Sequence, residues 1–181
     1  MILDGVTLKR IYKNPPTGSF QPYLGGSRRE VDRYVRDLAT ALAQSDLMAV
    51  SIDSYDLDNG YIAHLRVAFN KKFDPPFDPA PPVLMLYLST KAPIAIWGAA
   101  YFVKSEYRHL WSDIAIDTIG IPPAGNWDRE LEEIAAKLST AGMTIADQEI
   151  MKTELPFDVD FREYHQSGPP YTAFDLLFSW N

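Results

Sequence analysis

VLMLYLSTKAPIAIWGAAYFV, residues 83–103, is the stretch that decides the fold. Its two apolar segments have no polar face, which is typical of strands that are covered on both sides. Between them lies STKAP, whose serine, threonine and proline are typical of a turn. Lys91 lies in the middle of the stretch, where it would cost a membrane-spanning helix about 3 kcal/mol on insertion. We therefore predict a hairpin of two central strands and not a membrane span.

Two further strands are expected immediately before this hairpin. The segments 47–55 and 61–69 flank the sequence DNG at 58–60, which tolerates the positive φ angles of a hairpin turn. In the second segment, apolar residues alternate with a mixed set that includes His64 and Arg66. We expect this mixed set to face solvent, and we expect the four segments to form an antiparallel meander.

Two amphipathic helices are predicted, one on each side of the meander in the sequence. Over 27–44, apolar residues recur every three or four positions. Ser27 and Glu30 match a capping box, in which each side chain binds a free backbone amide of the first turn. The second helix is expected over 126–141, and Gly142 is expected to end it.

The patterns in the remaining segments are shorter. Residues 1–12 and 171–181 have apolar side chains at alternate positions and are expected to be strands, whereas 105–114 is compatible with a short helix and 143–151 with either structure. The whole pattern predicts a single α+β domain over 1–181. It would consist of a largely antiparallel sheet of about five to seven strands packed against two main helices.

Composition limits the cellular setting and the partners. The 181 residues suit one hydrophobic core, and the chain has no cysteine, which excludes disulfides and thiolate metal sites and fits a cytoplasmic location. No basic region precedes an apolar run at the N-terminus, so no secretory signal is expected. The formal net charge of −7 argues against binding to nucleic acid or to an anionic membrane.

The sequence contains no organised catalytic or cofactor motif. The G-x-S-x-G, G-x-G-x-x-G and Walker patterns are missing. The three histidines, His64, His109 and His165, are expected to be structural. We predict no cofactor, no metal ion and no catalytic residue.

An interaction edge is expected in the aromatic stretch 97–113. Aromatic side chains alternate there with charged ones, and Tyr, Trp and Arg often dominate the binding energy of protein interfaces. The leading hypothesis is therefore a non-catalytic protein-binding module. A protein partner would contact Tyr101, Tyr107, Arg108, His109 and Trp111.

The alternative is a small enzyme or a domain that binds an anionic ligand. Two glycines at 25–26 precede a predicted helix, whose N-terminus offers free amides beside two arginines. The acidic segment 158–165 would form the other side of the cleft. The residues of this alternative site are Arg28, Arg29, Asp158, Asp160 and His165.

The order of the predicted elements supports the leading hypothesis. Two helices that frame a meander, on an acidic chain without cysteine, resemble the small bacterial immunity proteins, which neutralise a toxin by binding it. The resemblance is one of topology and implies a protein partner. It carries no residue role to this chain.

Overall fold

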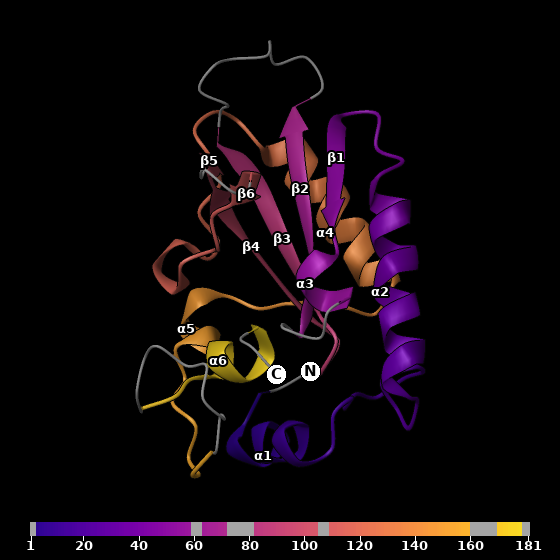
Figure 1. The fold of residues 1–181 in the computed structure, drawn as a ribbon, viewed down its shortest axis with the longest axis vertical. Helices are drawn as coiled ribbons and strands as arrows, with labels where there is room; N and C mark the ends of the chain where they lie inside the picture. Colours follow the sequence, from indigo (N-terminus) through magenta and orange to yellow (C-terminus); the bar gives the residue numbers. More distant parts are fainter. Residues whose placement is uncertain (1–2, 59–62, 72–81, 105–108, 160–169, 179–181) are drawn as a thin grey trace.

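The computed structural model describes residues 3–58, 63–71, 82–104, 109–159 and 170–178 (Figure 1). At its centre is a five-stranded sheet with the order β1-β2-β3-β4-β7, whose last two strands run parallel while the other neighbours run antiparallel. This confirms the predicted α+β fold, with the number of strands at the lower end of the expected range. The strands are β1 (Met48–Asp53), β2 (His64–Lys71), β3 (Val83–Ser89), β4 (Ile94–Ala100) and β7 (Thr144–Ile145).

The predicted central hairpin is formed by β3 and β4. Val83 pairs with Ala100 and Leu88 with Ala95, so the turn falls at Lys91 as the sequence indicates. All seven residues of β3 are buried, because the sheet is covered on both faces. The pairings β1–β2 and β2–β3 complete the predicted meander.

The two long helices cover one face of the sheet. They are α2 (Arg28–Leu42) and α4 (Asp128–Thr140), and both are confirmed predictions. The capping box of Ser27 and Glu30 is present, and Gly142 follows α4 with a φ of 75°. The apolar sides of these helices pack against β2 and β3 in one cluster that includes Val35, Ile134 and Leu86.

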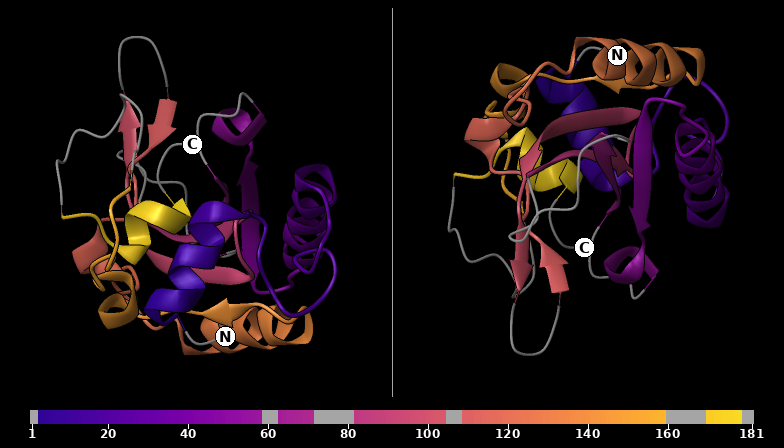
Figure 2. Two further views of the ribbon diagram at one scale, coloured as in Figure 1. Left: turned by 90° about the horizontal axis from the view of Figure 1, so that it is seen from below. Right: turned by 90° about the horizontal axis from the view of Figure 1, so that it is seen from above.

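Shorter helices cover the opposite face of the sheet. This second helical layer was not predicted from the sequence. Figure 2 shows α4 on one side of the strands and α6 on the other. The second cluster joins Leu8, Leu177 and Met151 to the other side of β3 and β4. The covering elements are α1 (Gly5–Lys13), α5 (Gln148–Met151), α6 (Ala173–Phe178) and the 3-10 helix η1 (Ile116–Thr118).

Two expected strands are helices in the structure. The strand expected over 1–12 is wrong, because Asp4 caps α1 by accepting a hydrogen bond from the Thr7 amide, and Leu8 and Ile11 share its buried side. The strand expected over 171–181 is also wrong, since its described part contains α6.

The N-terminus of α6 has a cap that explains this second error. The Asp175 carboxylate accepts hydrogen bonds from the amide and the hydroxyl of Thr172, and the Asp175 amide donates to the Thr172 hydroxyl. Such reciprocal capping begins a helix where alternation alone indicates a strand.

Three smaller elements complete the fold. The short helix expected over 105–114 is wrong for its described part, because His109–Trp111 form strand β6, which pairs with β5 (Phe102–Lys104). Helix α3 (Tyr55–Asp58) lies where the β1–β2 turn was expected to begin. The segment 143–151 contains both a strand, β7, and a helix, α5.

Gly98 marks a close crossing of two segments, as its place in β4 indicates. It forms an isolated antiparallel bridge with Ile119, and a Cβ atom at this position would lie 2.7 Å from the Thr118 carbonyl oxygen. In the described ranges, no helix combines the length and the apolar character that crossing a bilayer requires.

Candidate functional site

The mixed face of β2 is buried, which corrects the expectation that it meets solvent. His64 and Arg66 are 2% and 8% exposed. They point into the layer that contains α1 and α6, and His64 stacks on Tyr87 with 4.1 Å between ring centroids and meets the edge of Phe178. The error came from the second helical layer, which covers this face.

Arg66 is the centre of a polar network that fastens the loop after β6 to the sheet. Its guanidinium donates to the Asp113 carboxylate at 2.9 Å and lies 3.8 Å from Asp53. The Tyr87 hydroxyl donates to the same Asp113 oxygen at 2.9 Å and accepts a hydrogen bond from the Ile114 amide at 3.0 Å. Each of these contacts joins one element to another, so we interpret the network as structural.

His64 belongs to the same buried layer and is held neutral. Burial lowers its pKa well below the usual value, and the charges of Arg66 and Lys91 add to this shift, while the nearby backbone of Phe178 opposes it. Burial also raises the pKa of Tyr87, and the Asp113 carboxylate adds to that effect.

The predicted interaction edge is described only in part. Tyr101 is 59% exposed, and its amide donates to the Ser112 hydroxyl at 2.8 Å. His109 and Trp111 begin and end β6, while Tyr107 and Arg108 lie outside the described residues. Ile121, whose carbonyl accepts a hydrogen bond from the Ala99 amide, is 54% exposed at the same end of β4.

Of the predicted anion site, the residues that the structure describes do not line one common pocket. Arg28 and Arg29 are both exposed at the start of α2. Asp158 is exposed and lines a separate pocket with residues 155–159 and 170–171. Asp160 and His165 lie outside the described residues.

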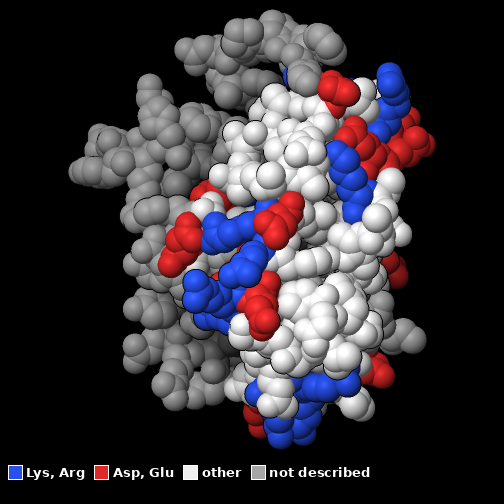
Figure 3. Space-filling view, turned by 90° about the vertical axis from the view of Figure 1, so that its right-hand side faces the viewer, with Lys and Arg blue, Asp and Glu red and all other residues white. Residues whose placement is uncertain are grey.

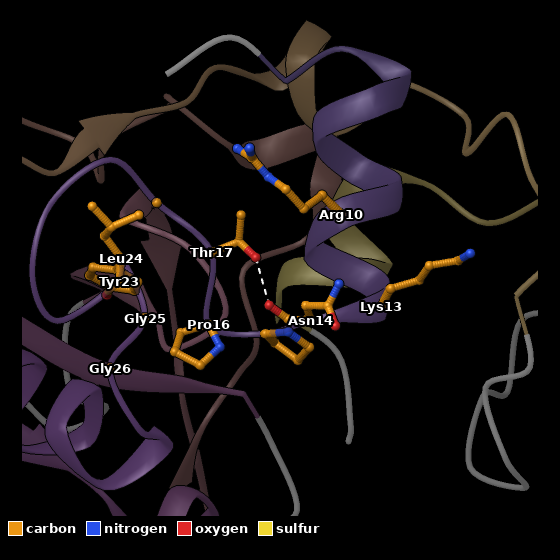
Figure 4. Close-up of a pocket in the computed structure, with 11 residues that line it drawn as sticks. Arg10, Lys13, Asn14, Pro16, Thr17, Tyr23, Leu24, Gly25 and Gly26 are labelled. Carbon is orange, nitrogen blue, oxygen red and sulfur yellow. Dashed lines mark hydrogen bonds between the residues drawn. The ribbon is translucent and has the colours of Figure 1, made fainter.

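Arg28 instead belongs to a cleft that is rich in positive charge. The cleft has two neighbouring parts, which we name the Arg10 pocket and the Lys91 pocket. The Arg10 pocket, with a volume of about 580 Å³, lies between the end of α1 and the loop 14–26 (Figure 4). The Lys91 pocket, about 60 Å³, is lined by Pro15, Pro16, Arg28, Thr90 and Lys91.

Hydrogen bonds to the β3–β4 turn hold the loop 14–26 in place. The Thr17 amide donates to the Lys91 carbonyl at 2.8 Å, and the Thr17 hydroxyl donates to the Asn14 carbonyl at 2.7 Å. The Tyr23 hydroxyl, which is buried, donates to the Ser89 carbonyl at 2.7 Å. The wall of the cleft is therefore formed before any ligand binds.

Gly25 lies at the open mouth of the Arg10 pocket, and its backbone conformation favours glycine. Gly25 has a φ of 73°, and no atom would lie within 4 Å of a Cβ atom placed on it. In Figure 4, the Arg10 guanidinium extends from α1 toward this loop, whereas the Lys13 ammonium points away from it. Arg10 is thus the cation that faces the pocket, and Lys13 lies at its rim.

Acidic side chains lie near two of the cations that line the cleft: the Arg10 charge favours a lower pKa for Asp4, and the Arg28 charge opposes the rise that burial causes in the pKa of Asp32. Among the described residues, neither Arg10, Lys13, Arg28 nor Lys91 forms an ion pair. The Lys91 ammonium donates a hydrogen bond to the Leu176 carbonyl at 3.0 Å. The pKa of Lys91 is lowered to about 8, mainly by burial and to a smaller extent by the nearby Arg28 charge.

Basic side chains also gather on the molecular surface near the cleft. In Figure 3, basic side chains gather at the lower end, at the level of α1, whereas basic and acidic side chains alternate over α2 above it. The last turn of α1 supplies Arg10 and Lys13. The cleft therefore has an excess of positive charge on a chain whose net charge is −7.

Comparison with models of known families, with curated proteins and with solved structures gave no match. Within the described ranges, no group of three or more histidine, aspartate or glutamate side chains is placed to hold a metal ion.

Sequence reasoning pointed to Gly25, Gly26 and Arg28, which line the cleft, and missed Arg10 and Lys91. Arg28, Arg10 and Lys91 come from α2, α1 and the β3–β4 turn, which are far apart in the sequence. A usable signal was present in Lys91, the one charged residue of the stretch that decides the fold. A lysine that interrupts an apolar run is costly to bury, so its position beside a cavity is informative.

Proposed function

We propose that this protein is a binding domain for an anionic ligand, which the cationic cleft holds. The observation that carries the proposal is the set of Arg10, Arg28 and Lys91, none of which has an ion-pair partner among the described residues. Two of these cations, Arg28 and Lys91, lie close enough for one to lower the pKa of the other. Such mutual repulsion is relieved when a phosphate or carboxylate group lies between them.

The chemistry of the lining supports binding and not turnover. Of the described residues, those that line the two pockets include no carboxylate and no histidine, the groups that most often act as general acids and bases. The volume of the Arg10 pocket lies within the range that small ligands fill, roughly 300–1,000 Å³.

A titration with inorganic phosphate, followed by NMR of the backbone amides at low ionic strength, tests this proposal. We expect the largest shifts at Thr17, Gly25 and Lys91. Arg28→Gln should weaken phosphate binding about five- to tenfold, because an ionised hydrogen bond contributes about 1.5–3 kcal/mol when it is well formed and less when it is solvent-exposed.

Arg29→Gln is the matched control, since Arg29 is also exposed but lines neither pocket. It removes the same charge and should leave the phosphate affinity within twofold. Equal losses in the two variants, or shifts scattered over the whole surface, would show a general electrostatic attraction and refute the cleft.

A second candidate function, binding of a protein at the β5–β6 end of the molecule, is favoured by the exposed Tyr101 and Ile121. These two apolar side chains lie at the end of β4, where the sequence predicts an interaction edge. With this second function go two predictions made from the sequence: a non-catalytic role like that of the immunity proteins, and a cytoplasmic location.

A further inference from the structure

The two parts of the cationic cleft share a wall. Pro15 and Pro16 line both the Arg10 pocket and the Lys91 pocket, so a molecule in one pocket lies next to the other across a short proline ridge. The residue that follows the ridge is fixed to the sheet, because the Thr17 amide donates a hydrogen bond to the Lys91 carbonyl. The spacing of the two pockets is therefore set by the fold.

Each pocket has its own positive charge. Arg10 faces the larger pocket, and Arg28 and Lys91 line the smaller one. A single phosphate or carboxylate group in the smaller pocket is separated from Arg10 by the ridge. One anionic group therefore leaves part of the positive charge of the cleft without a counterion.

We propose that the ligand carries two anionic groups on a short linker, one for each pocket, with the proline ridge beneath the linker. This inference rests on the proposed anion-binding function and specifies the class of ligand. The smaller pocket takes one terminal anionic group beside Arg28 and Lys91. The larger pocket takes the second group beside Arg10, together with any apolar part of the ligand, which would meet Leu24 and Pro16.

Two joined groups bind better than two separate ones for a general reason. Once the first group is bound, the second is held near its pocket at a high effective concentration, so the affinity rises without any new kind of contact. A rigid wall increases the gain, because little ordering remains to be done on binding.

A series of probes of increasing length tests the inference: inorganic phosphate, pyrophosphate and triphosphate, each at the same ionic strength. For the unmodified protein we expect pyrophosphate or triphosphate to bind on the order of tenfold more tightly than phosphate, or better. In Arg10→Gln this gain, taken relative to the affinity of the same variant for phosphate, should fall to about twofold. Arg29→Gln should keep the full gain.

The outcomes separate the two proposals. If phosphate binds in the cleft but the longer probes gain equally in Arg10→Gln and Arg29→Gln, the gain follows net charge, and the two-group ligand is refuted while the anion site stands. If neither longer probe binds more tightly than phosphate, the two-group ligand is likewise refuted. If no probe shifts the amides of the cleft, the anion site itself is refuted.

Discussion

His64 shows how a single residue can be placed correctly on a strand and still be misjudged. Its alternation with Leu65 is confirmed, since the two residues belong to opposite sides of β2. A polar residue on one side of a strand indicates a solvent face only when nothing covers that side. Here α1 and α6 cover it, so the sequence pattern was sound and the conclusion about exposure was wrong.

The lowered pKa of His64 gives a pH dependence with a definite sign. The unfolded chain binds a proton near pH 6.5, but the folded chain does so only at a lower pH, so the unfolded state holds more protons in between. The free energy of unfolding is therefore expected to fall as the pH drops below 6.5, by up to about 1.4 kcal/mol per pH unit. Urea unfolding at pH 7.5, 6.5 and 5.5 measures this slope.

His64→Phe is the informative variant, because it keeps a ring that can stack on Tyr87 and removes the titration. The slope between pH 6.5 and 5.5 should be smaller in this variant, since the other two histidines and all carboxylates are unchanged. Parallel stability curves for the two proteins would contradict the assignment of this pH dependence to His64.

At the scale of elements, length decided which predictions succeeded. Helices α2 and α4, of 15 and 13 residues, have several turns of apolar periodicity, so their stripes were unambiguous. Helix α6 has 6 residues, too few to distinguish a period of two from a period of 3.6. The same ambiguity affected α1, which has 9 residues.

The reciprocal cap at the start of α6 is expected to be important for stability. Thr172→Ala removes a hydroxyl that both donates to and accepts from Asp175, and the loss of such a cap typically costs about 1 kcal/mol. Because α6 packs against the sheet through Leu176 and Leu177, this loss should reduce the free energy of global unfolding in urea.

Thr140→Ala is a suitable control for this change. Thr140 ends α4, is exposed and bonds only a carbonyl within its own helix, so its loss should alter the unfolding free energy by less than about 0.5 kcal/mol. Equal stabilities of the two variants would show that α6 does not depend on its cap.

At the scale of the whole molecule, the two candidate surfaces lie at opposite ends. Figure 1 places α1 at the lower end of the long axis and β5 and β6 near the upper end. The cleft is built from segments that only the tertiary fold brings together, which is why the sequence pointed to Arg28 and the glycines at 25–26 but not to Arg10 or Lys91. The exposed Tyr101, by contrast, lies in a continuous stretch and was found from sequence alone.

This separation predicts that the two surfaces can be altered independently. Replacing both Tyr101 and Ile121 with serine should abolish capture of any protein that binds the β5–β6 end, since truncating a central aromatic contact at an interface costs about 2 kcal/mol or more. The same double variant should bind phosphate like the unmodified protein, because neither residue lines the cleft. Affinity capture from native lysate and the phosphate titration measure the two properties in parallel.

Val6→Ser is the control for lost apolar surface, because Val6 is 79% exposed and lies on α1, at the other end of the molecule. A protein captured by the unmodified chain and by Val6→Ser, but not by the double variant, would be bound through the predicted edge. If the double variant captures the protein equally well, the β5–β6 end does not bind it, and the exposure of Tyr101 and Ile121 has no role in binding. The cleft, whose described lining holds cations and no carboxylate, would then be the candidate binding surface that remains.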